Sequence, residues 1–166
     1  FITDALRLWF KADVAFQNSG AIKEGIKKGV FTLGDLYNVI PYDNETVCFN
    51  LSGADLREIF TAAASLKKGV IQVSGASYAF THRNSDDFEL DEVFVNDLPL
   101  DASQTYRVAT NEYLANGGDE FTAFKQGKDS VSGPFLREIV KSHLQNLGSS
   151  GPISISLGNR IKVRKN

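Results

Sequence analysis

The chain has 166 residues, of which 42% are hydrophobic and 23% are charged, and its formal net charge is −2 at pH 7. This length suits one domain or two small ones, and the composition excludes a disordered, collagen-like or coiled-coil chain. The near-neutral charge gives no electrostatic reason to expect a nucleic-acid polymer as a partner, and no apolar run approaches the roughly 20 residues that span a bilayer.

The first part of the chain predicts alternating helices and strands joined by polar turns. Thr32 and Ser52 are typical helix N-caps, and Asp55 follows Ser52 at the spacing of a capping box. The predicted elements are a helix at 1–11, a strand at 13–16, a loop at 17–21, an extended piece at 30–31, a helix at 33–39, a turn at 41–44, a strand at 45–51, and a helix after Ser52 with an inner face of Leu56, Ile59, Phe60 and Ala63.

The rest of the chain is rich in predicted strands. Asn96-Asp97 is a plausible hairpin turn, and Pro134 after Gly133 is typical of a helix start, with Gly148 able to end that helix. The predicted elements are strands at 70–73, 78–81, 92–95, 106–110 and 160–163, and a helix from Pro134 with an apolar face of Leu136, Ile139, Val140, Leu144 and Leu147. Helices between groups of strands indicate one α/β domain.

The residue types that hydrolytic chemistry needs are sparse. His82 and His143 are the only histidines, and they lack the spacing of metal ligands, so we interpret both as surface residues. Cys48 is the only cysteine, which excludes an internal disulfide, and its strand-like surroundings indicate a small buried hydrophobe. The sequence also has no G-x-S-x-G, P-loop or G-x-G-x-x-G motif. We therefore predict no catalytic residue and no metal ligand in this chain.

Three loops are better candidates for a binding site, namely residues 18–23, 41–44 and 113–119. They offer two tyrosines, side-chain amides, a lysine, glycines and a carboxylate. An aromatic face suits a flat heterocycle, a carboxylate suits a vicinal diol, and glycine permits close backbone approach. Each loop taken alone also fits a plain turn with an incidental tyrosine, so spacing leaves both interpretations open.

Taken together, these segments resemble the C-terminal domain of the 5′-nucleotidase/UDP-sugar hydrolase family. The family's N-G-G-x-[IR]-like loop corresponds to residues 18–23, its G-D-x-x-x-v-x-P-[FY] segment to 34–42, and its Y-r-v-a-T-N-x-[FY]-L-a-x-G-G-D-G-[FY] segment to 106–121. Residues 51–56 and 158–161 resemble two further segments, l-x-G-x-x-l and G-R-I. The resemblance covers nearly all of the chain and implies a domain with helices layered around mixed β-sheets.

The resemblance also implies a set of substrate-binding residues. By position, Tyr42 and Tyr113 match the two aromatics that sandwich the base, Asp119 matches the carboxylate that holds the ribose hydroxyls, and Asn18 and Gly20 line the base and ribose side. The full implied set is Asn18, Gly20, Lys23, Tyr42, Tyr113, Gly118 and Asp119.

Two positions depart from the family pattern. Lys23 stands where the family usually has an arginine that reaches ribose and phosphate, and it keeps the charge but loses the planar fork. Glu120 replaces the glycine that usually follows G-G-D, which can alter the turn. The base preference does not follow from either residue.

The function implied by the resemblance is recognition of the nucleoside part of a nucleotide. In the family, a separate N-terminal calcineurin-like metallophosphoesterase domain carries two divalent metals of the zinc or manganese type and performs the hydrolysis. We therefore expect residues 1–166 to be the substrate-binding domain, with no cofactor of its own, and to be inactive in isolation. The absence of methionine and of a signal peptide pattern indicates a piece of a longer polypeptide.

The parent protein implied by the resemblance is an exported 5′-nucleotidase, periplasmic or extracellular, that converts nucleotides to nucleoside and phosphate. The partners expected for this domain are a nucleoside or nucleotide and its own N-terminal catalytic domain. Two alternatives stay open. The parent could be a 2′,3′-cyclic-nucleotide phosphodiesterase or an NAD or UDP-sugar pyrophosphatase, or the domain could be a nucleotide-binding module without an active partner domain.

Overall fold

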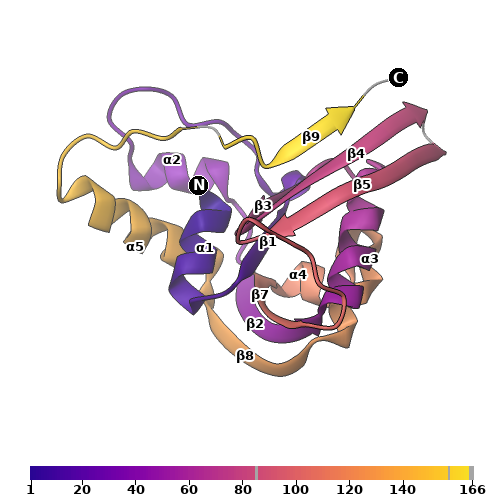
Figure 1. Ribbon diagram of the computed structural model, residues 1–166. Helices are drawn as coiled ribbons and strands as arrows, with labels where there is room; N and C mark the ends of the chain where they lie inside the picture. Colours follow the sequence, from indigo (N-terminus) through magenta and orange to yellow (C-terminus); the bar gives the residue numbers. More distant parts are fainter. Residues whose placement is uncertain (85, 157, 165–166) are drawn as a thin grey trace.

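The chain folds into helices and strands in a computed structural model that describes residues 1–84, 86–156 and 158–164 (Figure 1). The helices are α1 (Ile2–Phe10), α2 (Leu33–Val39), α3 (Gly53–Ala64), α4 (Glu112–Ala115) and α5 (Leu136–Gly148), with short 3-10 segments η1 (Ser19–Ala21), η2 (Gly118–Glu120) and η3 (Thr122–Gln126). The strands are β1 (Val14–Asn18), β2 (Glu45–Ser52), β3 (Ile71–Ser74), β4 (Ala76–Asn84), β5 (Asp87–Val95), β6 (Leu98–Pro99), β7 (Thr105–Asn111), β8 (Lys128–Phe135) and β9 (Ile161–Arg164).

The strands form two mixed sheets. The larger has the order β3-β1-β7-β2-β8, in which β1 and β7 are parallel and the other pairs are antiparallel. The smaller has the order β6-β5-β4-β9, in which only β4 and β9 are parallel. Two mixed sheets with helices around them confirm the predicted mixed α/β class.

Side-chain alternation divides the core into two parts on either side of the five-stranded sheet. Val14 and Phe16 of β1 join the larger cluster, whereas Ala15 between them joins the smaller one, as a period of two along a strand requires. The larger cluster packs α3 between the two sheets, and the smaller packs α1, α2 and α5 on the opposite face (Figure 1). The inner face predicted for α3 is confirmed, since all four of its residues are buried.

Helix starts were the most predictable local feature. Thr32 and Ser52 both form complete capping boxes, in which the hydroxyl accepts from the backbone N–H three residues on and the aspartate there accepts from the cap. These boxes satisfy backbone N–H groups that have no partner within the helix, which is why the two helices begin where they do. The predicted Asn96-Asp97 turn is also confirmed, because both residues have positive φ and lie between β5 and β6.

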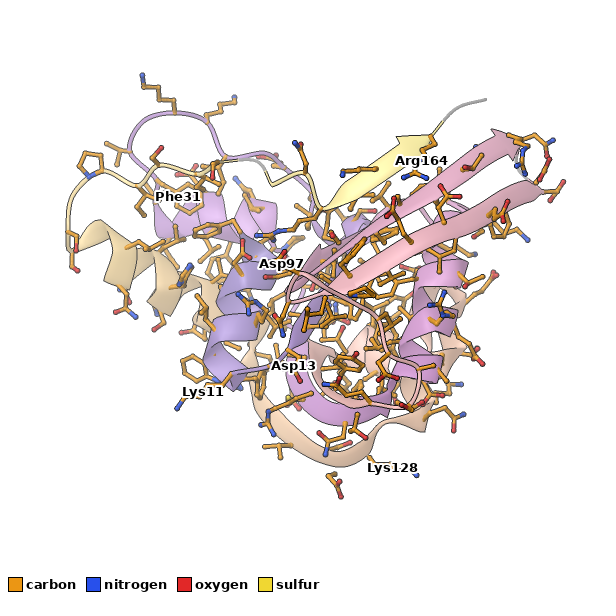
Figure 2. All side chains as sticks on the ribbon, viewed as in Figure 1. Lys11, Asp13, Phe31, Asp97, Lys128 and Arg164 are labelled. Atoms are coloured by element: carbon orange, nitrogen blue, oxygen red, sulfur yellow. The ribbon has the colours of Figure 1, made fainter. Side chains whose placement is uncertain are left out.

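The prediction around Pro134 was wrong. Gly133 and Pro134 lie in strand β8, and α5 begins at Leu136. Strand β8 is the outer strand of its sheet, and most of its side chains are exposed, so no apolar alternation marks it in the sequence. Lys128 at its start, labelled in Figure 2, is exposed. An edge strand tolerates proline because it has no second neighbour that needs the missing N–H.

Smaller corrections concern the ends of elements. Residues 30–31 form no strand, and residues 17–18 belong to β1 rather than to the following loop. Of the face predicted for the last helix, Leu136, Ile139 and Val140 are buried, whereas Leu147 is exposed near the end of the helix. Cys48 is buried as predicted, and this burial raises the pKa of its thiol.

Candidate functional site

One cavity brings together loops that are far apart in the sequence. Strands β1 and β7 run parallel, so Asn18 at the end of β1 and the α4–η2 segment after β7 emerge at the same edge of the sheet. The crevice beyond the carboxyl ends of parallel strands is a common ligand site. Here it is a cavity of about 360 Å³, lined by Asn18, Gly20, Ala21, Tyr42, Asn44, Lys68, Tyr113 and Asp119.

Five of the seven residues implied by the resemblance line this cavity: Asn18, Gly20, Tyr42, Tyr113 and Asp119. The remaining two, Lys23 and Gly118, each lie against one of the tyrosines. Lys23 Nζ lies 5.3 Å from the centre of the Tyr42 ring, and its backbone N–H donates to Val39. A Cβ on Gly118 would come within 2.5 Å of the Tyr113 ring, so only glycine allows this close approach.

Tyr42 and Tyr113 present open aromatic surface to the cavity. Each of these residues is 46% exposed. Tyr42 lies on the turn between α2 and β2, and Tyr113 lies in the short helix α4. Because Gly118 packs against the Tyr113 ring, the backbone of the 117–119 turn limits the positions that this ring can take.

A buried amide network fixes the orientation of Asn18. Asn111 Nδ2 donates to Asn18 Oδ1 at 3.1 Å and to Gln17 Oε1 at 3.0 Å, while Gln17 Nε2 donates to Asn18 Oδ1 at 3.2 Å. Asn111 Oδ1 in turn accepts from the N–H of Leu114 and caps α4. Since Asn18 Oδ1 is occupied by these donors, the Asn18 NH₂ group is directed to Asp119, where it donates to Oδ2 at 3.2 Å.

The Asp119 carboxylate is held by side chains rather than by loop amides. Tyr113 Oη donates to Asp119 Oδ1 at 2.9 Å, and Asn18 donates to Oδ2. The Asp119 N–H donates to the same Tyr113 oxygen at 3.2 Å. A carboxylate has about four acceptor positions, so these contacts orient it and leave acceptor capacity for a ligand. The hydroxyl that distinguishes Tyr113 from a phenylalanine therefore links the aromatic ring to the carboxylate.

Lys68 is a cavity residue that sequence reasoning missed. It lies in the loop between α3 and β3, and its ammonium forms an ion pair with Glu120 at 3.0 Å. The hydrogen bond and charge of Glu120 raise the pKa of Lys68, with smaller contributions from the charge of Asp119 and from Tyr113. The ammonium therefore stays charged beside Asp119. No motif surrounds Lys68, so only the packing of its loop could have identified it.

Glu120 occupies a strained backbone position, and replacing it should stabilise the fold. Its φ is 68°, in the left-handed region, where a residue with a Cβ costs roughly 1–2 kcal/mol. The exposed ion pair with Lys68 is screened by water and contributes little. We expect Glu120→Gly to raise the free energy of unfolding by about 0.5–1 kcal/mol, measured by urea denaturation.

Glu120→Gln is the matched control for this prediction. It keeps the backbone strain, loses the charge pair with Lys68 and should leave the stability nearly unchanged. A Glu120→Gly variant that unfolds at lower urea than Glu120→Gln would contradict the expected strain.

The described part of the chain lacks a cluster of metal ligands and a helix that could span a membrane. No group of three or more His, Cys, Asp or Glu side chains within residues 1–84, 86–156 and 158–164 could hold a metal ion. His82 on β4 and His143 on α5 lie on separate elements, and both are partly exposed. None of the helices in the described ranges is both long enough and apolar enough to cross a bilayer.

Comparisons with known proteins find similar chains. Residues 1–126 match the family model described as "5'-nucleotidase, C-terminal domain". The Trifunctional nucleotide phosphoesterase protein YfkN of Bacillus subtilis (strain 168) is 31% identical over 161 residues, which cover 91% of this chain and 11% of that protein. Protein UshA of Escherichia coli (strain K12) is 28% identical over 149 residues, which cover 88% of this chain and 26% of that protein.

A solved structure shows the same arrangement. The crystal structure of the 5'-nucleotidase precursor from Thermus thermophilus superimposes with a TM-score of 0.87 at 33% sequence identity. The match covers 98% of this chain and 34% of that chain. The chain thus spans between about a tenth and a third of the length of these relatives.

Proposed function

The chain belongs to the 5'-nucleotidase C-terminal domain family, and on that premise we propose that it recognises the nucleoside part of a nucleotide for a phosphoester hydrolase. The observation that carries the proposal is the convergence of Tyr42, Tyr113 and Asp119 on one cavity. Its volume of about 360 Å³ falls within the usual range for small-molecule sites. Two relatives bear the names of a nucleotide phosphoesterase and a 5'-nucleotidase precursor.

Each part of a nucleoside has a matching group in the cavity. The exposed rings of Tyr42 and Tyr113 offer faces on which a base can stack. The Asp119 carboxylate can accept from both hydroxyls of a cis diol, and a charged acceptor makes stronger hydrogen bonds than a neutral one. Asn44 and Asn18 add amide groups at the same cavity. A nucleoside therefore fits the cavity better than a sugar or a heterocycle alone.

One positive charge beside the cavity, that of Lys23, suits a ligand that also carries a phosphate. The Lys23 ammonium lies over the Tyr42 ring. A 5′-phosphate would compete with that ring for the interaction with the ammonium. A lysine offers a point charge rather than the bidentate fork of arginine, so it attracts phosphate without fixing its orientation. We assign Lys23 to this outer, phosphate-facing side of the proposed site.

The reaction itself would take place outside this chain. We propose that the parent is exported and carries an N-terminal metallophosphoesterase domain with two divalent metals, which holds the phosphate while this domain holds the nucleoside. A cyclic-nucleotide phosphodiesterase or a pyrophosphatase would use the same nucleoside contacts. A D-x-H…G-N-H-[DE] metal motif upstream in the parent gene would support an enzyme, and its absence would favour a binding module.

The isolated chain is expected to release no phosphate from AMP, with or without added Mn²⁺ or Zn²⁺. Two-metal hydrolysis needs clustered ligands, and the described ranges hold no such cluster. The measurement is inorganic phosphate released by the purified chain, compared with the Asp119→Ala variant prepared in parallel. Phosphate release that depends on metal and disappears in Asp119→Ala would contradict the proposal that hydrolysis takes place in a separate domain. Equal phosphate release by both proteins would indicate a contaminating phosphatase.

A calorimetric titration with adenosine tests the proposed function, with adenine and ribose as matched partial ligands. We expect adenosine to bind more tightly than either part alone, because only the whole nucleoside engages both the rings and the carboxylate. The proposal would be contradicted if adenosine bound no more tightly than ribose. It would also be contradicted by the absence of any heat of binding up to ~10 mM adenosine, a concentration at which a binding free energy near −3 kcal/mol is detectable.

A further inference from the structure

Arg137 is a buried cation outside the cavity. It lies in the first turn of α5, and its side chain is 6% exposed. A buried guanidinium is costly unless its donors are paired. Its position near the start of a helix is also unfavourable for a positive charge, because the macrodipole is positive there. Helix stability therefore does not account for an arginine at this position, and its contacts have to be considered.

The contacts described for the Arg137 side chain all fall within residues 37–43. Nη1 donates to the backbone oxygen of Ile40 at 2.8 Å, and Nη2 forms an ion pair with Asp43. The guanidinium carbon lies 3.9 Å from the centre of the Tyr37 ring. Ile40 and Asp43 stand on either side of Tyr42 in the sequence, so one side chain holds the turn both before and after this tyrosine.

The turn itself has little internal support. Helix α2 ends at Val39, residues 41–44 belong to no helix or strand, and Pro41 has no N–H to donate. The N–H of Leu136, the residue before Arg137, donates to the backbone oxygen of Asn44 at 3.0 Å. Two successive residues of α5 thus anchor the segment that presents the exposed Tyr42 ring.

We infer that Arg137 is a positioning residue for ligand binding, which sets the orientation of the Tyr42 ring through the 40–43 turn without touching the ligand. The inference rests on the proposed function and extends it to α5, a helix that contributes no lining residue described for the cavity. The role requires arginine, because a planar guanidinium can stack on Tyr37 while it donates in two directions. A lysine ammonium has no planar face with which to stack.

The test is a double-mutant cycle between Arg137→Lys and Tyr42→Ala, read as adenosine affinity by calorimetry. Arg137→Lys should weaken adenosine binding about tenfold, within the range of coupling between neighbouring residues. In the Tyr42→Ala background the same substitution should change affinity by less than about twofold, because the ring through which Arg137 acts is gone. An equal loss in both backgrounds, or no loss in the wild-type background, would overturn the inference.

Three further variants separate positioning from stability. Asp43→Asn removes the charge of the exposed partner of Arg137 but keeps an oxygen that can accept from Nη2, so it should lower stability yet still fold, and it should weaken adenosine binding in the same Tyr42-dependent way. Ile139→Val destabilises the buried face of α5 without contacting the turn, and Lys141→Met removes an exposed ion pair with Glu138. Both of these control variants should bind adenosine like wild type. A loss in Ile139→Val as large as that in Arg137→Lys would assign Arg137 a structural role only.

A readout without ligand keeps this inference distinct from the proposed function. Backbone order parameters for residues 42–44, measured by ¹⁵N relaxation, should fall from the rigid range near 0.85 toward 0.6 in Arg137→Lys. Unchanged order parameters would overturn the positioning role even if adenosine binds. If wild type does not bind adenosine but the order parameters fall, the proposed function fails while the anchoring of the turn stands.

Discussion

Replacing Tyr42 and Tyr113 together by alanine should weaken adenosine binding by roughly 2–6 kcal/mol, since each stacked aromatic contributes about 1–3 kcal/mol. Both rings line the same cavity and are nearly half exposed, so neither substitution removes a core side chain. Affinity should therefore fall steeply, whereas stability should fall only modestly, through loss of the hydrogen bonds between the Tyr113 hydroxyl and Asp119. The measurement is the dissociation constant for adenosine by calorimetry, with the melting temperature recorded in parallel.

Two control variants test whether the loss of affinity is specific to the stacking faces of these two tyrosines. Trp9→Ala removes an equally exposed aromatic from α1, which contributes no residue described for the cavity, and should leave adenosine affinity unchanged. Tyr42→Phe keeps the stacking face and should bind nearly like wild type. Equal adenosine affinity in wild type and in the double alanine variant would show that the two rings do not form the stacking platform.

Asp119→Ala should cost adenosine ~1.5–3 kcal/mol of binding free energy and cost 2′,3′-dideoxyadenosine much less. The carboxylate is oriented by Tyr113 and Asn18 and retains acceptor capacity for the two hydroxyls of a ribose. Substitution also leaves these two protein donors without their partner, so some loss of stability is expected. The difference between the two ligands isolates the contribution of the diol, because any general loosening of the loop affects both equally.

Tyr113→Phe provides an intermediate test of the same contact. It keeps the stacking ring but removes the hydroxyl that donates to Asp119. We expect a smaller loss than in Asp119→Ala, confined again to the ligand that carries both hydroxyls. If Asp119→Ala weakens adenosine and 2′,3′-dideoxyadenosine by the same factor, Asp119 has a structural role and the sugar assignment is wrong.

Local signals explain which parts of the fold were predictable. Thr32 and Ser52 mark the starts of their helices, because each cap and its aspartate lie only three residues apart in the sequence. The buried face of α3 follows from helical periodicity. Strand β8 was missed because its exposed residues have no apolar alternation. Gly133 and Pro134 then suggested a helix start, and only pairing with β2 shows that they lie in a strand.

The site was predictable where a motif marks it and unpredictable where only tertiary packing does. The resemblance identified the tyrosines and Asp119, but Gln17 and Asn111 are polar residues whose partners lie about ninety positions away along the chain. Lys68 and Arg137 stand in segments without a motif, and their importance follows from what the fold places beside them. A buried polar side chain shows its partner only once the chain is folded.

The most direct measurement of the central claim is a map of backbone ¹H–¹⁵N chemical shifts during an adenosine titration. Binding in the described cavity predicts shifts at Asn18, Gly20, Tyr42, Asn44 and Tyr113 that saturate together at one dissociation constant. A second polar cavity, lined by residues that include Arg7, Gly75 and Asn159, serves as the internal reference and should show none. Shifts centred on that second cavity, or no saturable shifts at the tyrosine-lined one, would contradict nucleoside recognition by this site.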